Sequence, residues 1–281
     1  MSEHASNLPA GLELGPSFRD VTAELREEYE QNNQLIDLTE AEPEDLRAQA
    51  EDVLSTLQSV YSLDRRKNEM AAKEVYVEGE SQPDMKQLAS LLIDARRFFQ
   101  ASLAMERARA RGERIDPQVS NMIHVYHYDL VEWMDKNLAK VGISQLTEWI
   151  SRASEQTVKA EGIVKGAAGE VAIKKLLKEM EPTTRYARPE EDAGGKDIIT
   201  FMPHDGKHFQ VAIDVKTYRG LKVHEHYRPL YTTRNGRVLH FRYGVDTEDI
   251  GEDGEIKPDH KLEHYHRLHN IDLSAKQKEM V

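Results

Sequence analysis

The sequence predicts an all-α region followed by an α/β (α+β) region, and three observations support this order. In the first 160 residues apolar side chains recur every three or four positions, as in Phe18, Val21 and Leu25. After about Gly162, short segments rich in Ile, Val, Phe and Tyr alternate with Gly, Pro, Asp and Asn. The pairs DG at 205–206 and NG at 235–236 are typical of turns between strands.

These patterns divide the chain into three parts. We expect a flexible lead over residues 1–15, a helical domain over 16–160 and an α/β domain over 161–281, with the boundary near 155–165, where one continuous helix could span it. Periodicity predicts helices over 18–34, 44–73, 84–111, 117–138, 144–158 and 167–180. Strands are expected over 185–187, 197–201, 209–215 and 238–243, the second and third forming an antiparallel hairpin with a wide loop.

Composition excludes several classes of protein. The 281 residues are 39% hydrophobic and 31% charged, and no apolar run approaches the roughly 20 residues of a membrane-spanning helix. The first residues, MSEHASNLPAG, lack the basic and apolar regions of a secretory signal. The chain has no cysteine, which excludes disulfides, thiolate nucleophiles and cysteine zinc sites. A reducing compartment fits this composition, and we expect a cytoplasmic protein without membrane contact.

The net charge of −12 argues against nucleic acid as a partner, but its distribution weakens that objection. Residues 1–160 hold 18 Lys and Arg against 29 Asp and Glu, a net of −11, while residues 161–281 hold 20 against 21, a net of −1. The acidity therefore belongs to the helical part. That part is expected to engage a partner protein or to mediate dimerisation.

Three acids and one lysine follow one another on predicted elements of the second part. Glu170 lies in the helical segment GAAGEVAIKKLLKEM, Asp197 in GGKDIITFM, and Asp214 and Lys216 in the strand FQVAIDVKTY. Because side chains alternate along a strand, Asp214 and Lys216 point to the same face. Carboxylate oxygens are the ligands that Mg²⁺ prefers, and a lysine beside them can orient or acidify an attacking water. The pattern predicts a divalent-metal site for phosphodiester hydrolysis.

This pattern resembles the PD-(D/E)xK, or restriction-endonuclease-like, nuclease superfamily over about residues 163–245. The order of a helix with Glu, a strand with Asp and a strand with Asp-x-Lys is similar to its αβββ core, and the GE, DI and VKT segments are similar to Mrr-like catalytic cores. Lys196 stands where a proline is common in that family. No resemblance covers residues 1–160.

The resemblance implies an Mg²⁺-dependent deoxyribonuclease, with Mn²⁺ as an alternative metal. It implies that Asp197, Asp214 and the main-chain carbonyl of Val215 bind the metal, that Glu170 assists as a further ligand, and that Lys216 is the catalytic lysine. The products would be a 5′-phosphate and a 3′-hydroxyl. By analogy of fold alone, the setting is a prokaryotic antiviral defence or restriction system, with a helicase-type ATPase or a second copy of the chain as partner.

Two other functions stay open from the sequence. A D-x-K on a strand is also compatible with a solvated strand face, and a degenerate nuclease fold could bind nucleic acid or act as an adaptor without cutting it. An RNA nuclease would use the same residue types. Thr217, Arg219 and Lys222 directly follow the motif and are candidates for phosphate contacts.

Further basic and aromatic residues in the second part suit contact with a nucleic-acid backbone and base stacking. They are Arg228, Arg234, Arg237 and Arg242, interleaved with Tyr227, Tyr231, Phe241 and Tyr243. His260 and His264 have the spacing of metal ligands on one helix face, but without a matching carboxylate in the sequence pattern we expect surface or partner-facing roles.

Overall fold

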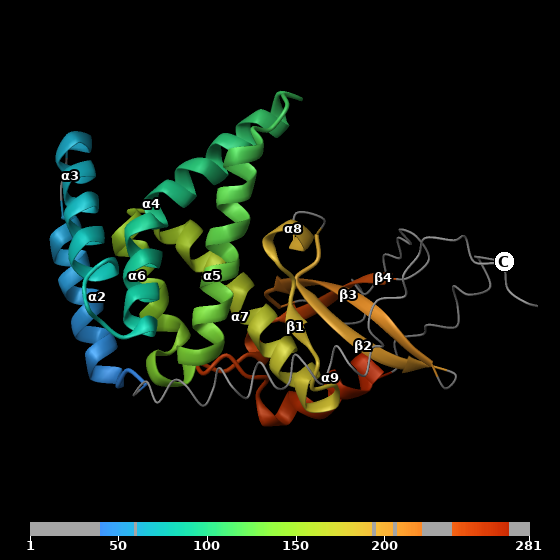
Figure 1. Cartoon of the computed structure of the whole chain (residues 1–281). Coiled ribbons are helices and arrows are strands. Elements are labelled where there is room, and N and C mark those ends of the chain that lie inside the picture. Colours follow the sequence, from blue (N-terminus) through green and yellow to red (C-terminus); the bar gives the residue numbers. More distant parts are fainter. Residues whose placement is uncertain (1–39, 59–60, 193–194, 205–206, 221–237, 270–281) are drawn as a thin grey trace, which may run out of the picture. The chain divides into compact units, whose positions relative to one another are not determined.

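The structure is a computed structural model that describes residues 40–58, 61–192, 195–204, 207–220 and 238–269 (Figure 1). The predicted helix over 18–34 and the NG turn at 235–236 lie outside the described residues. The described residues from Ala41 onward form one compact unit. That unit is mostly helical and contains one small mixed sheet of four strands.

In the described residues, six α-helices precede the sheet. They are α2 (Pro43–Leu57), α3 (Ser62–Ala72), α4 (Pro83–Ala110), α5 (Pro117–Val141), α6 (Ile143–Ser154) and α7 (Thr157–Met180), with a π-helical turn η1 (Lys73–Val77) after α3. Proline opens α2, α4 and α5, where its missing N–H costs no hydrogen bond. Asp116 also caps α5, since its Oδ1 accepts from the backbone N–H of Gln118 at 2.9 Å.

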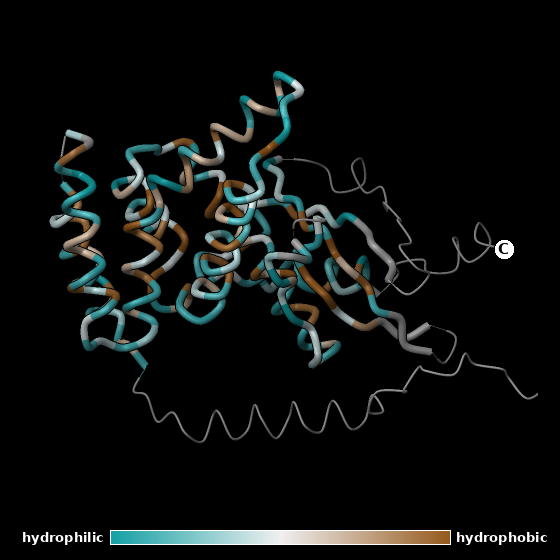
Figure 2. Tube along the Cα trace, turned by 45° about the horizontal axis from the view of Figure 1, so that its top comes forward, coloured by the Kyte–Doolittle hydropathy of each residue, from teal (hydrophilic) through white to brown (hydrophobic). Residues whose placement is uncertain are grey.

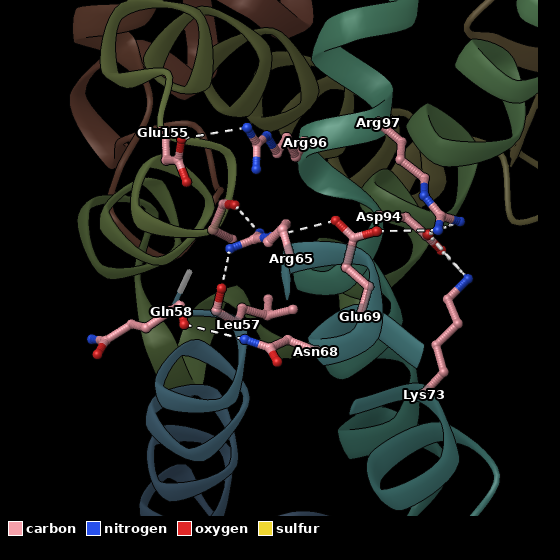
Figure 3. A network of polar contacts seen from close by, with 11 residues as sticks. Leu57, Gln58, Arg65, Asn68, Glu69, Lys73, Asp94, Arg96, Arg97 and Glu155 are labelled. Atoms are coloured by element: carbon pink, nitrogen blue, oxygen red, sulfur yellow. Dashed lines mark hydrogen bonds and ion pairs between the residues drawn. The ribbon is translucent and has the colours of Figure 1, made fainter. Parts of the chain in front are cut away.

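The expected continuous helix over 44–73 is wrong, because the chain leaves helical backbone at Gln58. Arg65 of α3 explains how this break is stabilised (Figure 3). Its buried guanidinium donates to the carbonyl oxygens of Leu57 at 2.5 Å and Ala153 at 2.6 Å, and pairs with Glu69 at 3.3 Å. The end of α2 thus receives the donor that a following helical turn would have supplied.

The sheet has the order β1-β2-β3-β4, formed by β1 (Arg185–Tyr186), β2 (Ile198–His204), β3 (Lys207–Tyr218) and β4 (Val238–Asp246). The first two pairings are antiparallel and the pairing of β3 with β4 is parallel. The expected hairpin of the second and third strands is confirmed, but the expected wide loop is wrong, because the pairing extends to His204 and Lys207. The remaining elements are α8 (Pro189–Asp192), the 3-10 turn η2 (Thr247–Asp249) and α9 (Pro258–His269).

Helix α7 joins the helical part to the sheet, since it packs against α5 and α6 and also against β3. It begins at Thr157 rather than at the expected residue 167, so the predicted domain boundary at 160/161 falls inside its first turns. Val211, Ile213 and Val215 of β3 belong to the same core as the buried side chains of α7, whereas Ala212 packs with Ala187 and Ile199 in a separate small cluster. Figure 2 shows hydrophobic residues gathered between the helices and along the strands.

Gly169 sets the close approach of α7 to β3. A Cβ built on Gly169 would lie 2.3 Å from Cγ2 of Thr217 and 3.7 Å from Cγ1 of Val215. With a side chain there, the helix, the strand or the Thr217 methyl group would have to shift. The neighbouring residue Glu170 is thereby brought to the sheet. Among the described residues, no helix is long and apolar enough to cross a membrane.

Candidate active site

Asp197 is fixed to β3 by its backbone and by its side chain. Its N–H donates to the carbonyl oxygen of Ile213 at 2.8 Å, next to the first register pair of β2 with β3, Ile198 with Ile213. Its Oδ2 accepts from the backbone N–H of Val215 at 2.6 Å. The carboxylate of the residue before β2 is therefore held next to the strand that carries Asp214 and Lys216.

The ammonium of Lys216 lies between two carboxylates from neighbouring strand segments. Its Nζ forms an ion pair with Oδ1 of Asp214 and lies 4.0 Å from Oδ2 of Asp197. Both acidic side chains are 7% exposed, whereas Lys216 is 44% exposed. The structure thus brings together three of the residues that sequence reasoning singled out, with the acids buried and the lysine reaching solvent.

Glu170 lies on α7 within electrostatic range of Asp197 and Lys216. It is buried, and Oε1 of Glu170 is 3.2 Å from Nε2 of His127 on α5. Burial first, and then the negative charge of Glu170, raise the pKa of Asp197 well above its usual range, although Lys216 and His127 act in the opposite direction. Ionising all the acids of this cluster together is therefore costly without further positive charge.

Burial by itself would lower the pKa of Lys216, but Asp197, Asp214 and Glu170 outweigh it and raise that pKa above the usual value. Lys216 is therefore an ammonium ion at neutral pH. A residue in this form acts as a fixed positive charge and hydrogen-bond donor, and it is not a proton acceptor.

A second cation reaches Asp214 from the neighbouring parallel strand. Asp214 and Arg242 face each other in the register of β3 and β4, and Nε of Arg242 is 2.8 Å from Oδ2 of Asp214. This contact, led by its hydrogen bond, raises the pKa of the guanidinium. The two oxygens of Asp214 thus contact two different cations.

The acidic side chains of this site are of the chemical type that binds a hard divalent cation. Glu170, Asp197 and Asp214 are buried carboxylates, and a bound cation would offset the charge that makes Asp197 hard to ionise. The part of the chain that the structure describes contains no group of three or more His, Cys, Asp or Glu arranged as a metal-binding cluster. The three predicted carboxylate ligands, Glu170, Asp197 and Asp214, therefore do not form such a cluster as they stand, although each is of the type that a divalent cation prefers.

The predicted nucleic-acid contacts lie in different surroundings. The Thr217 side chain packs beside Gly169 of α7 and is half-buried, while Arg219 is exposed and lowers the pKa of Glu161 after the larger effect of Lys165. Lys222 lies outside the described residues, as do Tyr227, Arg228, Tyr231, Arg234 and Arg237. Tyr243 is fully buried, so the expectation that it stacks on a base is wrong.

The two histidines with metal-ligand spacing share a carboxylate that the sequence pattern did not indicate. Asp249 lies 3.1 Å from Nδ1 of His260 and 3.0 Å from Nε2 of His264 through its two oxygens. The hydroxyl of Tyr243 is 2.8 Å from Nδ1 of His264, and burial lowers the pKa of this histidine. In the neutral ring Nε2 donates to Asp249 and Nδ1 accepts from Tyr243, so His264 links α9 to β4 instead of facing a partner.

A cavity of about 460 Å³ lies between α4 and α5, away from the acids and the lysine. Asp94, Phe98, Tyr126 and Asp129 are among its lining residues, and none of Glu170, Asp197, Asp214 and Lys216 is. The candidate site is thus separate from this cavity.

Sequence reasoning missed His127 entirely, and it named Arg242 only as one of several basic residues. A register argument could have found Arg242, since a parallel strand after the Asp-x-Lys strand brings a basic residue beside Asp214. For His127 the sequence carries no comparable signal. Comparisons of the chain with protein-family models, with curated proteins and with solved structures give no match.

Proposed function

We propose that this chain is a divalent-metal-dependent nuclease that hydrolyses phosphodiester bonds in DNA. The observation that carries the proposal is the position of one ammonium, Lys216, against Asp214 and Asp197 and in the electrostatic range of the buried Glu170. Electrostatic stabilisation of a pentavalent phosphate needs this combination of oxygen ligands and a fixed positive charge.

The order of elements supports the same family. A helix with Glu170 is followed by a strand that begins just after Asp197 and by a strand with Asp214 and Lys216, as the PD-(D/E)xK resemblance implies. The small mixed sheet is compatible with a restriction-endonuclease-like αβββ core, and assignment to that core is part of the proposal.

Each residue has a distinct role in the proposed reaction. Asp197 and Asp214, with the Val215 carbonyl, would hold Mg²⁺ or Mn²⁺, and Glu170 would assist. The metal would supply charge compensation and a more acidic water. Lys216 would orient that water through its N–H donors, and its exposed end would face the substrate. Arg242 adds positive charge next to the site for a phosphate of the backbone.

The wider setting follows only from the resemblance. It comprises prokaryotic antiviral defence or restriction, action with a helicase-type ATPase, and pairing with a second copy because one active site cuts one strand. The two rival functions are an RNA nuclease and a non-catalytic adaptor or nucleic-acid-binding protein. The pairing of Asp214 with both Lys216 and Arg242 suits the adaptor as a static ion-pair network.

A cleavage assay separates these functions. Plasmid, linear duplex, single-stranded DNA and RNA would be incubated with wild-type protein and Mg²⁺, Mn²⁺ or chelator, alone and with candidate partners. We expect metal-dependent cutting of DNA, lowered by about 10²-fold or more in Lys216→Ala and Asp214→Asn. Lys178→Ala, which changes an exposed lysine of α7, is the matched control and should cut normally.

Binding measured on the same variants decides between enzyme and adaptor. Asp214→Asn removes one negative charge beside Lys216 and Arg242, so it should bind DNA at least as tightly as wild type while it fails to cut. The nuclease proposal is overturned if wild-type protein leaves every substrate intact, with and without partners, and behaves like Lys216→Ala. If the protein cuts RNA but not DNA, the proposed substrate is RNA instead of DNA.

A further inference from the structure

The helical part of the chain supplies a side chain to the candidate active site. His127 lies on α5, before any of the residues that resemble a nuclease, and its Nε2 is 3.2 Å from Oε1 of Glu170. The two side chains are 22% and 8% exposed. This distance fits donation of a hydrogen from the imidazole to the carboxylate.

Helix α5 is attached to the helix that carries Glu170 by contacts of its own. Asp135 of α5 forms an ion pair with Lys174 of α7, whose Nζ also lies 5.0 Å from the ring centre of Tyr186 in β1. One turn further on, Leu138 of α5 and Val171 of α7 both lie against Gly254. The position of His127 is therefore set by a packed interface rather than by one exposed contact.

The contact with His127 affects which oxygen of Glu170 is available. Oε1 faces the imidazole, which leaves Oε2 for a metal-bound water or another ligand. A carboxylate in a metal site is commonly oriented by a hydrogen bond from outside the ligand set, and removal of such a partner costs about 10- to 100-fold in metal affinity or activity. His127 is such a partner of Glu170, because it lies outside the predicted ligand set and contacts the carboxylate.

We propose that His127 is a positioning residue of the active site, which holds the Glu170 carboxylate in the orientation that the metal requires. The helical part thereby completes the site in addition to any role with partners. This inference rests on the proposed function, because it assigns His127 a task only if Glu170 serves a metal. For donation to Glu170, the hydrogen of the neutral imidazole must be on Nε2.

The test uses the full chain and compares two changes at one position. His127→Gln keeps an N–H donor that can reach Glu170, whereas His127→Leu removes it at similar volume. His124→Leu, a histidine one turn earlier on α5, is the matched control. Calorimetric titration with Mn²⁺ alone, without DNA, gives a readout independent of cleavage, and thermal unfolding shows that each variant is folded.

We expect His127→Leu to weaken Mn²⁺ binding by about 10- to 100-fold and to lower kcat, with KM for DNA unchanged. His127→Gln should recover most of the loss, and His124→Leu should bind Mn²⁺ like wild type. Combined with Glu170→Gln, His127→Leu should weaken binding no further, because the histidine acts through that glutamate.

Two results would overturn the inference while the nuclease stands. In the first, the wild-type protein cuts DNA, and the folded His127→Leu variant has the same Mn²⁺ affinity and kcat. The other is a double variant whose losses simply add. A wild-type protein that neither binds Mn²⁺ nor cuts nucleic acid is a different result, since it removes the proposed function and the role of His127 together.

Discussion

Oδ2 of Asp214 lies 2.8 Å from Nε of Arg242, so a predicted metal ligand is already engaged by a cation from the neighbouring strand. The Arg242 side chain is 42% exposed and the Asp214 side chain 7% exposed. A metal bound at Asp214 must share this oxygen with Arg242 or displace it. Arg242 therefore influences both the affinity of the site for metal and its charge towards a phosphate.

The first prediction concerns this competition. Arg242→Gln should bind Mn²⁺ about two- to fivefold more tightly than wild type, because a partly exposed ion pair that opposes binding is worth up to about 1 kcal/mol. Isothermal titration without DNA measures the change. Arg219→Gln, which removes an exposed arginine at the end of β3, should leave the affinity unchanged. Weaker binding in Arg242→Gln would show that the guanidinium holds Asp214 in its ligating position.

The second prediction concerns the contact between α7 and β3. Gly169→Ala should destabilise the protein by about 1–3 kcal/mol, since its Cβ would lie 2.3 Å from Cγ2 of Thr217. Denaturant unfolding measures this. In Gly166→Ala nothing lies within 4 Å of the new Cβ, so better helix propensity should stabilise by about 0.5–1 kcal/mol. Thr217→Ser removes the clashing methyl and should restore much of the stability of Gly169→Ala; failure to do so would contradict the clash.

The third prediction concerns the buried guanidinium of Arg65. Arg65→Ala should cost about 3–5 kcal/mol in the free energy of unfolding, because it leaves Glu69 and two carbonyl oxygens without this donor. Arg65→Lys should not recover the loss, since a single ammonium cannot reproduce the planar fork. Arg66→Ala, at an exposed position beside it, should change stability by less than about 0.5 kcal/mol. Equal losses of stability in Arg65→Ala and Arg66→Ala would show that the buried contacts of Arg65 do not stabilise the fold.

The fourth prediction concerns pH and the pair of Arg185 with Glu191. The two side chains form bonds of 2.8 and 3.0 Å, and the hydrogen bond from Arg185 lowers the pKa of Glu191 from 4.5 to about 2. A carboxyl whose pKa is lower in the folded than in the unfolded state stabilises the fold at pH values above the unfolded pKa. This contribution is lost as pH falls from about 4.5 towards 2.

At neutral pH, Glu191→Gln should therefore be less stable than wild type by up to about 1 kcal/mol, a modest value because both side chains of the pair are partly exposed. Urea unfolding should show the difference shrinking below pH 4.5. Glu113→Gln, in an exposed pair with Arg111, is the comparison. A difference that stays constant from pH 7 to pH 3 would mean that the charge of Glu191 is not its cause.

The parts of the site that could be predicted depend on local periodicity. Asp214 and Lys216 are two residues apart on one strand, so alternation alone places them on one face. Asp197 could be placed on the neighbouring strand because a hairpin was expected, but the register was not predicted, since the pairing that reaches His204 and Lys207 lies beyond the expected strand ends. The contact of His127 with Glu170 could not be predicted in this way, because it depends on how two helices pack, and packing leaves no fixed spacing in the sequence.

The errors in the helices also have physical causes. Helix α7 begins ten residues before the expected residue 167, although Gly162 and Gly166 lie in this added segment and glycine disfavours helix interiors. Tertiary packing overrides this preference, and at Gly169 the packing requires glycine. The break at Gln58 was missed because the residue that stabilises it, Arg65, appears in the sequence as one of several charged residues of a polar helix.

The single helix α7 also makes the candidate site sensitive to insertions and deletions. Its early residue Ala160 is buried in the core, and Glu170 is on the same helix. One residue added between Ala160 and Ala167 would turn Glu170 by about 100° relative to the helices that hold the start of α7. Over evolution, the number of residues in this segment should therefore be conserved more strictly than their identities.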